Sequence, residues 1–300
     1  MTRPPHLSDI QRLLVFEPAD DEVFLCRHPN KTEPSLPSWA RLPINRCNLP
    51  AVILGSVTFQ HHPTSLILDG VTELHDDLFA LLDGIDDAAE RATLFCDYLA
   101  VHFCFDRLEE AGFDAHTGKR AKADWRRLLR GWSFDADGRE GAVLKGWVES
   151  RFGLLPRFHG APLRDFDGPA WRRYEQMRAA GLYGTNALEA QLDLVYTWCQ
   201  YEFRRRHPGQ THMTLHRGVN RFTEHEVLDD AGRQPTVLLN NLVSFTSSRE
   251  RAGEFGDFIL TARVPVAKIF FHCDLLPGVL QGEGEHLVIG GAYEVTLATL

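Results

Sequence analysis

Two kinds of hydrophobic pattern divide the chain. Between residues 76 and 182, apolar residues recur every three or four positions, which is the spacing of amphipathic helices. After residue 210 the period becomes two, which is typical of short strands that bury one face. The order of the two patterns predicts an α+β fold, with a mostly helical region followed by a β-rich region.

The two periods also give approximate bounds for the elements. The first predicts helices over residues 119–132, 142–152, 170–182 and 187–206, after longer amphipathic stretches from residue 76. The second predicts strands over residues 211–217, 236–239, 241–245, 257–264, 268–272, 286–289 and 293–297. Two earlier apolar runs, residues 51–54 and 65–70, are also strand-like. Because the last helix leads directly into the strands, we predict two domains, residues 1–184 and 185–300.

Charge and composition disfavour several function classes. The chain has 300 residues, 44% hydrophobic and 24% charged, as in ordinary soluble globular proteins. Its 41 acidic and 32 basic side chains give a net charge of −9, whereas proteins that bind nucleic-acid phosphates are usually basic. No apolar run has the length of a membrane span, and the N-terminus lacks an apolar signal segment. The six cysteines show no zinc-site spacing, so we expect reduced thiols and a cytoplasmic location.

Three short polar motifs follow one another in the β-rich region. The first, residues 215–218, is Leu-His-Arg-Gly at the end of a predicted strand. The second, residues 243–249, is Val-Ser-Phe-Thr-Ser-Ser-Arg, and the third, residues 281–287, is Gln-Gly-Glu-Gly-Glu-His-Leu. Each alone has an ordinary explanation, such as a solvated charge or a helix N-cap. Together, and in this order, they resemble the R-S-E pattern of arginine-specific mono-ADP-ribosyltransferases, which bind NAD without a Rossmann fold.

The whole chain also resembles the dinitrogenase reductase ADP-ribosyltransferase family of nitrogen-fixing bacteria. The resemblance implies a split β-sandwich catalytic core at residues 185–300 and an accessory, target-recognition region at residues 1–184. It implies NAD as a substrate, no metal, and transfer of ADP-ribose to an arginine of dinitrogenase reductase, the nitrogenase iron protein, which reversibly inactivates nitrogen fixation. A PII-type signalling protein becomes a plausible partner. Two alternatives stay open: an arginine transferase with another protein target, and a non-catalytic NAD-binding regulator.

Two glutamates of the third motif take chemical roles from the resemblance. When nicotinamide leaves NAD, positive charge develops on the ribose, and a nearby carboxylate stabilises it. Glu285 matches the family's catalytic glutamate. Glu283 matches the first glutamate of the E-x-E pair, which holds the acceptor guanidinium and draws off its proton. A Gln there accompanies other acceptors in the family, so Glu283 indicates arginine. Gln281 and Glu283 offer an earlier Q-x-E register, but the apolar strand begins directly after Glu285.

The first motif and two aromatic residues are assigned to NAD binding by the same resemblance. Arg217 matches the arginine of R-S-E, and its planar side chain suits a phosphate or braces the strand. Gly218 would hold the nicotinamide amide with its backbone. His216 precedes Arg217, in the position where the family often has an aromatic residue or a histidine, and packing or a local hydrogen bond is the alternative role. Phe245 or Phe255 would stack on nicotinamide, or else belong to the core.

The second motif allows two registers for the hydroxyl groups. One uses Ser244 with Thr246, and the other uses Thr246, Ser247 and Ser248. The second register keeps three consecutive hydroxyls before a short helix, as in the family, and we favour it. One of these hydroxyls would orient the catalytic glutamate, and the others would contact the nicotinamide ribose.

Overall fold

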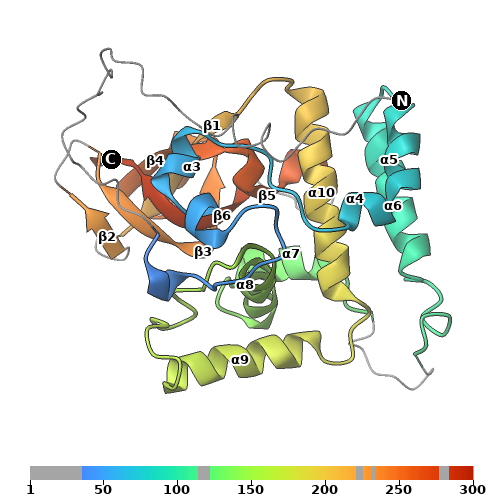
Figure 1. Ribbon diagram of the computed structural model, residues 1–300, viewed down its shortest axis with the longest axis horizontal. Helices are drawn as coiled ribbons and strands as arrows, with labels where there is room; N and C mark the ends of the chain where they lie inside the picture. Colours follow the sequence, from blue (N-terminus) through green and yellow to red (C-terminus); the bar gives the residue numbers. More distant parts are fainter. Residues whose placement is uncertain (1–35, 114–121, 221–225, 231–233, 277–283, 300) are drawn as a thin grey trace, which may run out of the picture. The chain divides into compact units, whose positions relative to one another are not determined.

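The structure is a computed structural model that describes residues 36–113, 122–220, 226–230, 234–276 and 284–299. All of these residues belong to one compact unit, Glu33–Leu300. Figure 1 shows its strands on one side of the long helix α10 (Leu188–Arg206) and the helices α5 (Asp76–Asp83) and α6 (Ala88–His102) on the other. The described residues thus confirm the α+β class.

The remaining helices lie mostly in the first two thirds of the chain. They are η2 (Ser38–Ala40), α2 (Ala51–Leu54), α3 (Val57–His61), α4 (Val71–Leu74), α7 (Trp125–Phe134), α8 (Arg139–Phe152), α9 (Pro169–Leu182), α11 (Arg249–Gly253), η4 (Val266–Lys268) and η5 (Cys273–Leu275). None of the described helices is both long enough and apolar enough to cross a membrane. The predictions for 142–152, 170–182 and 187–206 agree with α8, α9 and α10.

Three elements predicted in the first half of the chain differ from the structure. Residues 51–54 form the helix α2, because Pro50 precedes the apolar run and Gly55 closes it with a backbone bond to the carbonyl of Ala51. Residues 65–70 form no strand, and only an isolated bridge from Leu68 to Cys47 lies there. The described part of the predicted 119–132 helix begins at Trp125, because the Asp124 side chain accepts a hydrogen bond from the Arg127 N–H and caps it.

The strands pair in antiparallel fashion in the order β5-β6-β3-β1-β4-β7, with β2 beside β3. Their bounds are β1 (His212–Val219), β2 (Glu226–Asp229), β3 (Thr236–Thr246), β4 (Phe258–Pro265), β5 (Ile269–His272), β6 (Glu285–Glu294) and β7 (Thr296–Thr299). Among the described residues, β1 and β3 pair only at His216 and Thr246, whereas β3 and β6 pair over most of their length. The sheet therefore consists of two ladders, β5-β6-β3 and β1-β4-β7, which join at one corner through His216 and Thr246.

A bulge in β3 anchors the helix α8. The register of β3 against β6 shifts between Leu239 and Leu242, so two predicted strands form one irregular strand. At the bulge, the Asn241 amide donates to the carbonyls of Lys145 (2.8 Å) and Leu154 (3.0 Å). Opposite the bulge, a Cβ on Gly290 would lie 1.7 Å from the Asn240 carbonyl oxygen. The close approach of the two strands therefore requires glycine at this position.

Helices and strands share one hydrophobic core. The ring centroids of Trp147 on α8 and Phe270 on β5 lie 4.7 Å apart. Those of Phe95 on α6 and Trp198 on α10 lie 4.5 Å apart and nearly parallel. All four side chains belong to the same buried cluster. Packing thus crosses the position near residue 184, and the division into two domains there stays a prediction.

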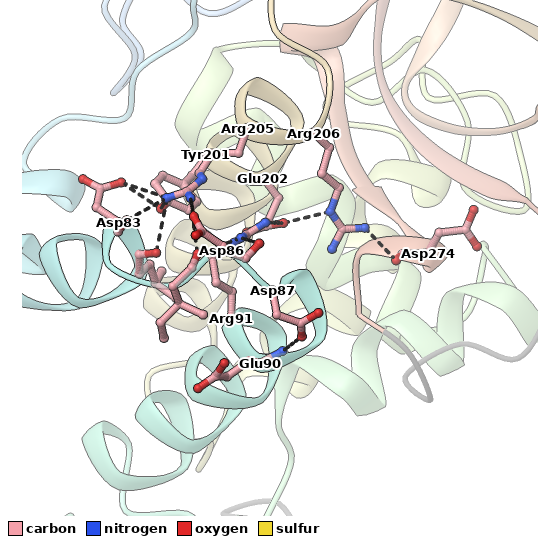
Figure 2. A network of polar contacts seen from close by, with 12 residues as sticks. Asp83, Asp86, Asp87, Glu90, Arg91, Tyr201, Glu202, Arg205, Arg206 and Asp274 are labelled. Carbon is pink, nitrogen blue, oxygen red and sulfur yellow. Dashed lines mark hydrogen bonds and ion pairs between the residues drawn. The ribbon is translucent and has the colours of Figure 1, made fainter.

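A buried ion network fixes α6 to α10 (Figure 2). The Glu202 carboxylate accepts from Arg91 Nε (2.5 Å) and Nη2 (3.0 Å), and from Arg206 Nε (2.8 Å). The side chains of Arg91 and Glu202 are 4% and 0% exposed. Arg206 also donates to the carbonyl of Asp274 in η5. The network therefore links α6 and α10 to the segment that follows β5.

Candidate active site

The three sequence motifs meet where the two ladders join. Thr246, at the end of β3, pairs with His216 of β1 and with Glu285 of β6. Arg217 follows His216, and Ser244 lies two residues before Thr246 on the same face of β3. The fold thus brings Arg217, Ser244 and Glu285 to one corner of the sheet.

The carboxylate of Glu285 is held on both oxygens. Ser244 Oγ donates to Oε1 at 2.7 Å, and Ser133 Oγ donates to Oε2 at 3.0 Å. Glu285 is half-buried, and Ser133 is exposed at the end of α7. A half-buried carboxylate with both oxygens hydrogen-bonded can stabilise positive charge that develops on a bound ligand.

Ser244 connects Arg217 and Trp132 to the Glu285 carboxylate by hydrogen bonds. Its backbone carbonyl accepts from Arg217 Nη1 at 2.8 Å. Its hydroxyl oxygen accepts from the indole Nε1 of Trp132 at 2.8 Å. Arg217 therefore braces the strand that carries Ser244, and Trp132 fixes the Ser244 hydroxyl. The sequence analysis did not identify Trp132 and Ser133 as site residues, because a Trp-Ser pair inside a helix belongs to no catalytic motif.

The other first-motif residues make local contacts. His216 Nδ1 lies 2.9 Å from Thr261 Oγ1, the local hydrogen bond named above as an alternative. Burial, reinforced by the charge of Arg249, lowers the pKa of His216, so its imidazole is neutral at neutral pH. A Cβ on Gly218 would lie 1.9 Å from the carbonyl oxygen of Ala252 in α11. Gly218 therefore lets α11 pack against β1.

The hydroxyls of Thr246 and Ser248 stabilise the turn that leads into α11. Thr246 Oγ1 accepts from the Ser248 N–H at 3.1 Å, and Ser248 Oγ caps α11 by accepting from the Arg251 N–H at 3.2 Å. Ser247 faces the third motif, since a Cβ on Gly284 would lie 2.8 Å from its Oγ. Of the four hydroxyls, Ser244 has a hydrogen bond to Glu285.

The remaining predicted residues differ in accessibility. Phe245 is 2% exposed and packs in the hydrophobic core, whereas Phe255 is 66% exposed. Glu283 and Gln281 lie outside the described residues, as does the whole segment 277–283. Gly284 is the first described residue of this motif and has a positive φ of 68°. A side chain would be strained there, so the turn before Glu285 favours glycine.

His286 stabilises the turn at Gly284. It is fully buried, and its Nδ1 lies 2.7 Å from the carbonyl oxygen of Gly284. Burial, reinforced by the nearby His272, lowers the pKa of His286 to about 3, so the ring is neutral. Since a carbonyl oxygen only accepts, Nδ1 carries the proton and donates it. His286, which follows the candidate catalytic Glu285, thus fixes the backbone of Gly284, which precedes Glu285.

One group of side chains that could bind a metal lies at the end of β5 and in η5, and β5 is the neighbour of β6. His272, Cys273 and Asp274 form the one group of this kind in the described part of the chain, with ligand atoms within 4.8 Å of one another. His272 Nδ1 already accepts from the Asp274 N–H at 2.9 Å and caps η5. This bond commits one ring nitrogen of His272 to the local backbone.

Comparison with known proteins covers most of the chain. The model of the family described as "Dinitrogenase reductase ADP-ribosyltransferase (DRAT)" matches residues 44–297. A protein of Rhodospirillum rubrum, "NAD(+)--dinitrogen-reductase ADP-D-ribosyltransferase", is 41% identical over 261 residues, which are 85% of this chain and 95% of that protein. No solved structure matches the chain.

Proposed function

This chain belongs to the dinitrogenase reductase ADP-ribosyltransferase family, and from this premise we propose that it transfers ADP-ribose from NAD to an arginine of dinitrogenase reductase. The observation that carries the proposal is the Glu285 carboxylate, hydrogen-bonded by Ser244 and Ser133 at the corner where the three motifs meet. The 41% identity with the Rhodospirillum rubrum enzyme over nearly its whole length supports the same reaction and acceptor.

In the proposed reaction, Glu285 acts on the ribose of NAD. The bond between the ribose anomeric carbon and the nicotinamide nitrogen breaks, and its electron pair stays with the nitrogen, so nicotinamide leaves as a neutral molecule. The ribose ring then carries the positive charge, which Glu285 stabilises. Because this leaving group needs neither a Lewis acid nor a general acid, we propose that the step uses no metal.

The acceptor nitrogen then forms a bond with the anomeric carbon. An arginine side chain is a poor nucleophile until it is oriented and loses a proton. We assign both tasks to Glu283, which holds the position of the first glutamate in the family's E-x-E pair. The proton passes to the Glu283 carboxylate, and the guanidinium nitrogen becomes bonded to ADP-ribose.

The other predicted residues receive roles that agree with their contacts. The bond from Arg217 to the Ser244 carbonyl supports a bracing role for this arginine beside NAD. The contact of Ser244 with Glu285 supports the register of Ser244 and Thr246, and not the one favoured from the sequence, whose Ser248 caps α11. Exposure favours Phe255 over Phe245 as the ring that stacks on nicotinamide. A PII-type protein remains a proposed regulatory partner from the resemblance.

Two variants test the proposal. Glu285→Gln keeps the shape of the side chain but removes its charge, so we expect both transfer and NAD hydrolysis to fall by about 10² to 10³-fold. Glu283→Gln should lose transfer to arginine but keep part of the hydrolysis. Purified dinitrogenase reductase is incubated with NAD and each variant, and mass spectrometry locates the modified residue. Full transfer by Glu285→Gln, or modification of a residue other than arginine, would contradict the proposal.

A further inference from the structure

Helix α7 reaches the catalytic corner from the helical region. Its last turn brings two consecutive side chains to the site, Trp132 to Ser244 Oγ and Ser133 to Glu285 Oε2. These contacts join parts of the chain that are 112 and 152 residues apart in sequence. The region before residue 184 thus supplies a direct contact to the carboxylate that the proposed function makes catalytic.

The chemistry of the indole sets the direction of the hydrogen bonds. A tryptophan Nε1–H only donates, so Ser244 Oγ accepts from Trp132 and its own proton points elsewhere. A carboxylate only accepts, so that proton goes to Glu285 Oε1. Trp132, Ser244 and Glu285 therefore form a chain of hydrogen bonds with one direction.

The second carboxylate oxygen is held from α7 alone among the described residues. Ser133 has two acceptors for its proton, Glu285 Oε2 at 3.0 Å and the Leu129 carbonyl at 3.4 Å, and the charged and nearer one is favoured. With bonds to both oxygens, the Glu285 carboxylate cannot rotate without losing a charge-assisted hydrogen bond. Its plane is thus fixed relative to the strands.

The helix that carries these groups is itself anchored. The Trp125 backbone N–H donates to Gln191 of α10 at 2.9 Å, and Asp124 caps the first turn. At the other end, the Trp132 ring is 4% exposed, and the Lys145 ammonium lies 5.7 Å from its centre. Anchoring at both ends of the helix gives Ser133 a defined position.

We propose that Trp132 and Ser133 are positioning residues, which hold the Glu285 carboxylate in the orientation that meets the charged ribose. The inference rests on the proposed role of Glu285. Positioning of a group that acts in the transition state lowers the barrier without tightening NAD binding. Substitution of Trp132 or Ser133 should therefore lower kcat and leave KM unchanged.

Ser133 offers a direct test with a matched control. Ser133→Ala should lower kcat for nicotinamide release by about 10-fold, with the KM for NAD changed by less than about two-fold. Ser133→Thr keeps the hydroxyl and should restore most of the activity. Thr93→Ala is the control, because Thr93 is an exposed hydroxyl on α6 that bonds the carbonyl of Ala89 in its own helix. It should leave kcat unchanged.

Trp132 gives an independent variant. Trp132→Phe keeps an aromatic ring but removes the N–H, so the Ser244 hydroxyl is free to turn from Glu285, and kcat should again fall by about 10-fold. Trp171→Phe is the control, because Trp171 lies on α9 in a separate buried cluster that contains no residue of the candidate site, and it should leave kcat unchanged. Circular dichroism and melting curves verify that each variant is folded.

The outcomes separate this inference from the proposed function. If Glu285→Gln keeps its activity, the proposed function fails, and this inference fails with it. If Glu285→Gln is inactive while folded Ser133→Ala and Trp132→Phe keep the wild-type kcat, only the positioning roles are overturned. A raised kcat in Ser133→Ala would also overturn the inference, because Ser133 would then compete with the ribose for the carboxylate.

Discussion

The Ser244 hydroxyl accepts one hydrogen bond and donates another, and this double use distinguishes it from the neighbouring hydroxyls. Ser244 and Thr246 share a face of β3, so Ser244 lies diagonally across from Glu285 on β6. Ser248 has left the strand and caps α11. The sequence favoured the register of Thr246, Ser247 and Ser248, because three consecutive hydroxyls precede a helix. Which hydroxyl lies beside Glu285 depends on the pairing of β3 with β6, for which the local pattern carries no signal.

A pair of variants distinguishes the two hydroxyl roles. Ser244→Ala should lower kcat by about 10-fold, because Glu285 loses the bond to Oε1. Ser248→Ala should lower the free energy of unfolding by about 1 kcal/mol through the lost N-cap, with kcat nearly unchanged. Steady-state kinetics and urea unfolding measure the two effects. A loss of kcat in Ser248→Ala alone would favour the other register.

At the scale of elements, periodicity predicted most of the long helices and strands, and it failed where an element is short or irregular. Residues 51–54 are four apolar residues, too few to show either period, and the helix α2 follows from Pro50 and Gly55 at its ends. The bulge at Asn240 and Asn241 interrupts the alternation in β3, so the sequence gives the appearance of two strands. The approach of α7 to Glu285 is a tertiary contact, for which the local pattern carries no signal.

The ion network between α6 and α10 gives a prediction at this scale. Glu202→Gln should lower the free energy of unfolding by about 3–5 kcal/mol, because Arg91 stays buried without its counter-charge. Glu110→Gln is the control, since the pair of Glu110 and Arg107 is exposed and should change stability by less than about 1 kcal/mol. Chemical denaturation of both variants provides the measurement. Equal effects would show that burial does not strengthen the Glu202 pair.

At the scale of the whole molecule, the helical region and the sheet depend on one another. Trp147 packs on Phe270 across the predicted domain boundary, and Asn241 of the sheet holds the backbone of α8. Ser133 and Trp132 extend this dependence to the candidate catalytic carboxylate. A displacement of α7 would therefore change the orientation of Glu285 without any change in the strands.

Buried neutral histidines make the stability of the whole fold depend on pH. Burial, reinforced by the Lys145 charge, lowers the pKa of His159 to about 4, and His286 has a pKa of about 3. In the unfolded chain both pKa values return to about 6.5, so between pH 6.5 and pH 4 the unfolded state binds more protons. The free energy of unfolding should therefore fall as the pH falls through this window, by up to about 1.4 kcal/mol per pH unit for each histidine.

The histidine contribution can be isolated by difference. His159→Gln and His286→Gln remove one titrating group each, so the slope of unfolding free energy against pH between 6.5 and 4.5 should be smaller in each variant than in the wild type. His62→Gln is the control, because this histidine is exposed. Urea unfolding at several pH values gives the slopes. Equal slopes in all four proteins would mean that His159 and His286 reach water before the chain unfolds.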